Sequence, residues 1–251
     1  MNPDFFSWPD IRELIARSTP WRQSLLAVYS RLPATRCRRR TRCCSLLPEM
    51  SLPEALIALD GIRRFPLDRR VRVLKKSIRY FLINPLEITS CPFLEGTDCL
   101  IYDDRFFGCR AYGLWSPEEY QRRIEADRSA KRNMGELWLR SGIRLPAAVV
   151  DFQLPYCREV LPAEAGLIPD PLLREAEEKI EQISGQLHPW SGRFRDCYFS
   201  DWSFLIAGLI FGIPEAVRLK FNLVKEGLQT GSRQRLEDVV SGLDLRGDLF
   251  T

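Results

Sequence analysis

The chain has 251 residues, of which 45% are hydrophobic and 28% are charged, and this is the composition of an ordinary globular protein. Its 37 basic and 33 acidic residues leave a net charge of +4, which is too small to indicate nucleic acid or a membrane surface as a partner. A chain of this length buries enough apolar surface to fold without covalent cross-links, so its eight cysteines need another explanation.

The N-terminal segment, residues 1–36, is predicted to be helical. Pro9 lies near a helix start, and the apolar residues Ile11, Leu14 and Ile15 recur at helical spacing. The first residues lack the basic stretch and apolar run of a secretory signal, so we expect the chain to be in the reducing cytoplasm. In that compartment cysteines bind metals or act in catalysis more often than they form disulfides.

The middle of the chain alternates predicted helices with irregular segments. We expect a short helix that Ser51 caps and Gly61 ends, and a second helix over residues 68–83, where apolar residues follow the helical period. Residues 84–115 are punctuated by Pro, Gly and Asp and are predicted to form loops and short strands. Another helix is expected after Ser116, whose side chain can cap it.

The last hundred residues are also predicted to be mostly helical. Residues 144–171 are rich in proline and should be irregular, whereas residues 170–185 carry an apolar stripe at helical spacing. Further helices are expected near residues 201–212, near 214–226 and within 232–244.

The apolar run at residues 202–217 bears on membrane contact. It is shorter than the roughly 20 residues of a membrane span and it contains Pro214. We therefore expect a buried helix here and no transmembrane span, and the alternative is a segment that touches a membrane surface.

Six of the eight cysteines fall into two groups. Cys37, Cys43 and Cys44 lie among arginines in the sequence ATRCRRRTRCCSLLPEM, and the second group is Cys91, Cys99 and Cys109. Thiolates bind zinc or iron, and either metal takes about four ligands. The chain has a single histidine, His188, which is predicted to be structural or at the surface, so a metal site here would be dominated by sulfur. This favours an iron–sulfur cluster or a structural all-thiolate zinc over a catalytic zinc.

The stretch CPFLEGTDCLIYDDRFFGCRAY resembles the second half of the signature of the YkgJ-like cysteine-cluster family, whose members are described as zinc- or iron-chelating. The first half of that signature is C-x2-C-x2-C-C, and here Arg40 stands where the second cysteine is expected, between Cys37 and Cys43. Phe106 also departs from the pattern, because the family usually has proline at this place. The resemblance covers about residues 37–115.

The resemblance implies a cysteine-ligated metal centre, and relatives that methylate flagellin lysines are described as iron–sulfur proteins. We therefore expect a [4Fe–4S] cluster in electron transfer or redox support of a protein partner, with ligands drawn from Cys43, Cys44, Cys91, Cys99 and Cys109. Cys37 would be a further ligand or a neighbour. The alternatives are a zinc-stabilised accessory module without a redox role, and a protein-modifying enzyme similar to the lysine methylases.

The remaining two cysteines, Cys157 and Cys197, lie beside aromatic residues, and each could complete a ligand set or pack as a core thiol. Eight cysteines are also the number that two four-cysteine clusters would need.

Arginines are predicted to compensate the negative charge of a thiolate-bound metal and to lower the pKa values of the thiols. The candidates are Arg36, Arg38, Arg39, Arg40, Arg42 and Arg110. Tyr102 and Arg105 match the family signature, and we expect Tyr102 to pack over the centre and Arg105 to bond loop carbonyls. Nucleic acid is not expected as a partner of the basic run, because no interleaved aromatic residues accompany it.

Other familiar sources of chemistry are missing from the sequence. It contains no G-x-G-x-x-G after a strand, no P-loop and no G-x-S-x-G. The expected fold is mainly α, with an irregular cysteine-rich metal-binding core that contains short strands and is clasped by helices. We expect an N-terminal helical segment at 1–36, the cysteine-cluster domain at 37–143, and a C-terminal helical region at 144–251 packed on it.

Overall fold

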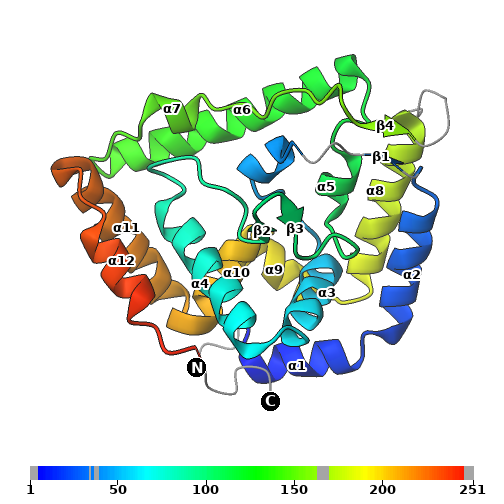
Figure 1. The fold of residues 1–251 in the computed structure, drawn as a ribbon, viewed down its shortest axis with the longest axis horizontal. Coiled ribbons are helices and arrows are strands. Elements are labelled where there is room, and N and C mark those ends of the chain that lie inside the picture. Colours follow the sequence, from blue (N-terminus) through cyan, green and yellow to red (C-terminus); the bar gives the residue numbers. More distant parts are fainter. Residues whose placement is uncertain (1–4, 34, 37–39, 163–169, 246–251) are drawn as a thin grey trace.

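The computed structural model describes residues 5–33, 35–36, 40–162 and 170–245, and α-helices dominate this part of the chain (Figure 1). The mainly α expectation is therefore confirmed. The helices are α1 (Trp8–Ala16), α2 (Thr19–Ser30), α3 (Leu52–Arg63), α4 (Leu67–Ile83), α5 (Phe107–Ala111), α6 (Pro117–Arg140), α7 (Ala147–Val150), α8 (Asp170–Gly185), α9 (Trp190–Tyr198), α10 (Trp202–Phe211), α11 (Ile213–Thr230) and α12 (Gln234–Ser241).

The strands in the described residues form two small antiparallel pairs. The first joins β1 (Thr35–Arg36) to β4 (Leu161–Pro162), and the second joins β2 (Leu94–Glu95) to β3 (Asp98–Cys99). In the second pair Leu94 lies opposite Cys99. A 3₁₀ helix, η1 (Arg42–Ser45), precedes α3. The short strands expected between residues 84 and 115 are thus confirmed.

Local capping sets several helix starts. The backbone N–H and the hydroxyl of Ser51 both donate to the Glu54 carboxylate at 2.8 Å, which fixes the first turn of α3. Ser116 accepts from the backbone N–H of Glu119 at 3.1 Å and begins α6. Asp201 caps α10 in the same way. The predicted starts at Ser51 and Ser116 are confirmed.

Three details of the sequence-based prediction were wrong. Gly61 does not end α3, because the helix continues through it to Arg63. The short helix α5 lies where only loops and strands were expected. The helix α9 was missed, because only Phe194 and Tyr198, four residues apart, are buried within it.

The core centres on α10, which lies between α4, α9 and α11 (Figure 1). Residues 202–208 are all buried, and the Trp202 indole N–H donates to the Ser77 hydroxyl of α4 at 2.9 Å. The expected buried helix is confirmed, and Gly212 divides the apolar run into α10 and α11. None of the helices in the described ranges is both long and apolar enough to cross a membrane.

The long helix α6 runs along one side of the molecule and is held at its two ends (Figure 1). Near its start, Arg123 donates to the carboxylate of Glu177 on α8 at 2.9 and 2.7 Å. Near its end, Trp138 stacks on Phe221 of α11 with ring centroids 5.8 Å apart. The residues between these anchors are mostly exposed, and among them Lys131 donates to the Phe152 carbonyl at 2.9 Å.

Candidate metal centre

Four chain segments bring five cysteines to the wall of one cavity of about 60 Å³. Cys43 and Cys44 come from η1, Cys91 from the loop after α4, Cys99 from the end of β3, and Cys109 from α5. A cavity needs about 10–15 Å³ to hold one water molecule, so this cavity has room for several atoms. No disulfide joins the cysteines within the described residues.

Backbone hydrogen bonds hold the cysteine segments together. The N–H of Cys91 donates to the carbonyl of Cys44 at 2.7 Å and connects two segments far apart in sequence. The N–H of Leu94 donates to the carbonyl of Cys91 at 3.0 Å, and the N–H of Leu100 donates to the carbonyl of Phe93 at 2.9 Å. These bonds fold the loop toward β3. These backbone bonds therefore hold the cysteine segments around one cavity.

The buried carboxylate of Glu54 anchors α5, the helix that carries Cys109. One carboxylate oxygen accepts from the Tyr29 hydroxyl and from the backbone N–H of Phe107, both at 2.6 Å. The other oxygen accepts the two bonds from Ser51. Sequence reasoning missed this role, although the spacing of Ser51 and Glu54 is the signal of a capping box.

An aromatic wall closes the cavity on the core side. Phe106 is 1% exposed, and its ring lies 5.8 Å from Phe93 and 6.5 Å from Trp202. Phe93 and Trp202 are 5.1 Å apart. Phe106, which stands where the resembled family usually has proline, thus fills the core behind the cysteines.

The thiols of this cavity perturb one another. The Cys43 and Cys44 sulfur atoms are 3.8 Å apart, and a hydrogen bond from Cys44 lowers the pKa of Cys43 to about 7. The same hydrogen bond raises the pKa of Cys44. Burial raises the pKa of Cys91 to about 12, and burial also raises the pKa values of Cys99 and Cys109. Charge on neighbouring thiolates adds to these increases, so several thiolates share the cavity only if a cation compensates them.

Arg105 brings a positive charge to the cavity wall. Its guanidinium lies over the Tyr102 ring, 3.8 Å from the centroid, and its Nε donates to the Tyr102 carbonyl at 2.9 Å. Both residues line the cavity. The predicted bond from Arg105 to a loop carbonyl is confirmed. Its charge opposes the burial-driven rise in the pKa values of Cys99 and Cys109.

Arg110 lies behind this loop rather than on the cavity wall. Its Nε donates to the Arg105 carbonyl at 2.8 Å, and one of its terminal nitrogens donates to the Asp103 carbonyl. The guanidinium also lies over the Tyr29 ring, with its carbon 4.3 Å from the centroid. Arg110 therefore holds the carbonyls of the loop that presents Arg105.

Several predicted site residues are placed elsewhere. Arg40 is exposed, forms an ion pair with Glu159 at 3.1 Å, and is not among the residues that line the cavity. Cys157 packs near Gly113, and Cys197 lies in α9, both away from this lining. Arg42 is exposed and is also outside this lining. The remaining ones, Cys37, Arg38, Arg39 and the side chain of Arg36, lie outside what the structure describes.

The sulfur atoms line the cavity without converging on one point. Among the described residues, no three Cys, His, Asp or Glu side chains form a group that could hold a metal ion as they are placed. The composition of the wall still fits a metal, because its polar groups are mostly thiols with one guanidinium nearby. Ligation therefore requires the thiols to turn toward a common centre.

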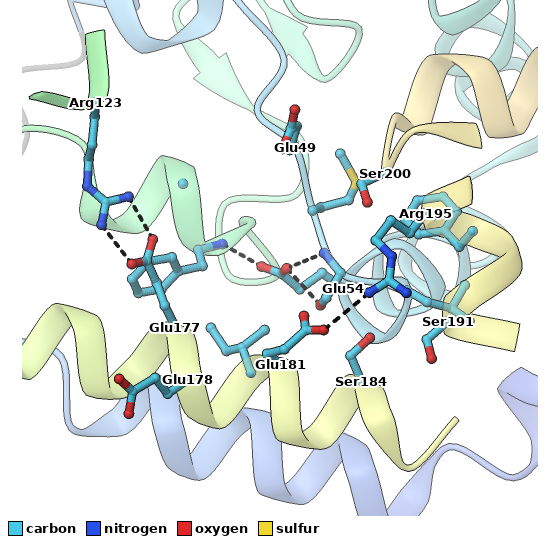
Figure 2. Close-up of a pocket in the computed structure, with 17 residues that line it drawn as sticks. Glu49, Glu54, Arg123, Glu177, Glu178, Glu181, Ser184, Ser191, Arg195 and Ser200 are labelled. Atoms are coloured by element: carbon cyan, nitrogen blue, oxygen red, sulfur yellow. Dashed lines mark hydrogen bonds and ion pairs between the residues drawn. The ribbon is translucent and has the colours of Figure 1, made fainter. Parts of the chain in front are cut away.

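Two larger cavities border this region and share Glu49, Gly108 and Arg123. One, of about 650 Å³, lies beneath α6, and Cys43 and Cys109 belong to its wall as well as to the cysteine cavity. The other, of about 620 Å³, lies beside α8 and α9 and is lined by several carboxylates (Figure 2).

Comparison with known proteins found no match to this chain among family models, curated proteins or solved structures.

Proposed function

We propose that this chain is a cysteine-ligated metal protein that holds a [4Fe–4S] cluster in the cytoplasm and serves a protein partner in electron transfer or redox support. The ligands would come from Cys43, Cys44, Cys91, Cys99 and Cys109, with Cys37 as a further ligand or a neighbour. The observation that carries this proposal is that five cysteines from separated segments line one cavity.

The electrostatics of the cavity support a bound cation. Metal ligation needs deprotonated thiols, whereas burial holds the pKa values of Cys91 and Cys109 above their ordinary value. A thiolate that binds a metal loses this burial penalty, because the metal supplies the opposite charge. Arg105 contributes a second positive charge at the same wall. The metal would therefore bind with release of protons and with a gain in folding stability.

The number of thiols and the size of the cavity favour a cluster over a single zinc ion. Five cysteines exceed the four ligands of a structural zinc site, and the cavity of about 60 Å³ accommodates more than one ion. A [4Fe–4S] cluster supplies one-electron transfer, and nearby charges and hydrogen bonds to sulfur set its potential. Arg105 is the residue of this wall best placed to tune that potential.

The cavity beneath α6 gives a redox partner or substrate access to the centre. Cys43 and Cys109 line both cavities, so a group bound under α6 touches ligand residues directly. Part of that wall is apolar and includes Leu46, Pro48 and Ile124.

The decisive measurement is the iron, zinc and sulfide content of protein purified without oxygen. We expect about four iron atoms and four sulfides per chain, with absorption near roughly 400 nm that dithionite bleaches. Cys99→Ser should lose this content, and Cys197→Ser is the matched control because its thiol lies outside the cavity lining. Zinc without sulfide would overturn the cluster. Unchanged metal content in Cys99→Ser would overturn the ligand set.

A further inference from the structure

The cavity beside α8 and α9 is acidic although the chain as a whole is basic. Its volume is about 620 Å³, and its charged lining consists of Glu49, Glu54, Glu177, Glu178, Glu181, Arg123 and Arg195. Five carboxylates thus face two guanidiniums (Figure 2). The net charge of the chain is +4, so this acidic cavity is a local concentration of negative charge rather than a property of the whole surface.

Some of these carboxylates are already paired and others are not. Glu54 is used in the α3 cap and by Phe107, and Glu177 pairs with Arg123. Glu181 faces Arg195 at 3.7 Å, in an exposed pair. Glu178 and Glu49 form no hydrogen bond or ion pair with any residue that the structure describes. Partial burial, and then repulsion from Asp127 and Asp201, raises the pKa of Glu49.

A hydroxyl without a protein partner also faces the acidic cavity. Ser184 of α8 is 6% exposed, it belongs to the cavity lining, and its hydroxyl points toward Arg195 and Ser191 in Figure 2. The described residues offer this hydroxyl no hydrogen bond. A ligand that enters the cavity can bond to this hydroxyl in place of water.

We propose that the acidic cavity binds an aliphatic polyamine. Glu177 and Glu181 lie one helical turn apart on α8, and Glu49 lies at another edge, so the negative charge is spread along the cavity. A chain of ammonium groups separated by methylenes matches charge that is distributed in this way. The methylenes would contact the apolar lining, which includes Met50, Ile180 and Phe194, and an ammonium would donate to the Ser184 hydroxyl. The volume lies within the usual range for small-molecule sites.

This proposal is independent of the metal centre. The cavity shares Gly108 with its neighbour beneath α6, but none of the five clustered cysteines lines it. Cys99→Ser should therefore keep polyamine binding even if it loses its metal, so the two proposals can fail separately.

The test is titration calorimetry of spermidine into the full-length protein at physiological ionic strength. We expect saturable binding of one spermidine per chain. Glu178→Gln should weaken binding about threefold, because it removes one exposed carboxylate. Ser184→Ala should weaken it about tenfold, because it removes a hydrogen bond to a charged group. Glu136→Gln is the matched control, since Glu136 is exposed on α6 and outside the cavity lining.

Three results would overturn the proposal. The first is the absence of a saturable signal with the wild-type protein. The second is equal weakening by Glu136→Gln and Glu178→Gln, which would indicate diffuse charge attraction. The third is equally strong competition by Mg²⁺ at the same concentration, because an ion without methylenes gains nothing from the apolar lining. Thermal midpoints of all variants, measured beside the wild type, exclude unfolding as the cause of any loss.

Discussion

Replacing Glu54 by alanine should destabilise the fold and the cysteine cavity together. The side chain is 5% exposed, and its carboxylate accepts bonds from Tyr29, from Phe107 and twice from Ser51. Alanine leaves the buried N–H of Phe107 and the hydroxyl of Tyr29 without acceptors, at about 1–3 kcal/mol each. The lost cap of α3 adds about 1 kcal/mol. We therefore expect the free energy of unfolding to fall by about 4 kcal/mol.

Glu54→Gln is the matched comparison. The amide oxygen can still accept from Tyr29 and Phe107, whereas the amide nitrogen faces the donors of Ser51 and the cap is lost. The expected loss is then about 1–2 kcal/mol. Urea unfolding followed by circular dichroism measures both variants. Equal losses for Ala and Gln, or a loss below about 1 kcal/mol for Ala, would refute the assignment of Glu54 as the anchor of α5.

Three further predictions concern other contacts. Asp60→Asn should cost about 3 kcal/mol in urea unfolding near pH 7, since it leaves Arg22 facing a neutral group in place of a buried carboxylate 2.7 Å away. Burial alone would raise the pKa of Asp60, but hydrogen bonds from arginines hold it below its ordinary value. The stability that Asp60 contributes is therefore present above about pH 4 and is lost as the pH falls through the folded-state pKa. A decrease in unfolding free energy below about 1 kcal/mol for Asp60→Asn would contradict this reasoning. Burial lowers the pKa of Lys220 to about 8, so the unfolded chain binds more protons than the folded one between about pH 8 and 10.5. The stability of the wild type relative to Lys220→Met should therefore rise by about 3 kcal/mol across that range, and parallel pH profiles would contradict this. Trp138→Ala removes the stack on Phe221 and should speed amide hydrogen exchange in the second half of α6 but not in α8. Equal acceleration of exchange in both helices would argue against Trp138 as a local anchor of α6.

The sequence was most informative where local chemistry sets the structure. The starts of α3 and α6 follow from Ser51 and Ser116, and the apolar run at residues 202–217 predicted the buried helix. These signals lie within a few residues of what they determine, so they can be recognised without knowing the rest of the fold.

The arrangement of the candidate site needed the structure. The backbone hydrogen bond from Cys91 to Cys44 joins residues from segments far apart in the chain, and no local pattern encodes such a contact. The division of the arginines is similar, because Arg105 and Arg40 are both near cysteines in sequence but only Arg105 lines the cavity. The acidic cavity was not predicted either, since α8, α9 and residues 49–54 create it only when they pack together.

Gly108 connects the two proposed sites in a way that thermodynamics makes measurable. It lines the acidic cavity and the cavity beneath α6, it precedes Cys109, and a Cβ atom at its position would stand 2.8 Å from the Cβ of Pro48. The α5 segment at Gly108 and Cys109 therefore borders the acidic cavity on one side and carries a proposed metal ligand, and it is tightly packed at this point. If a cation on one side changes how firmly Cys109 binds metal on the other, the metal must change the affinity for that cation by the same factor. Titrations of the metal-loaded and metal-free protein would thus report a single coupling constant from either direction.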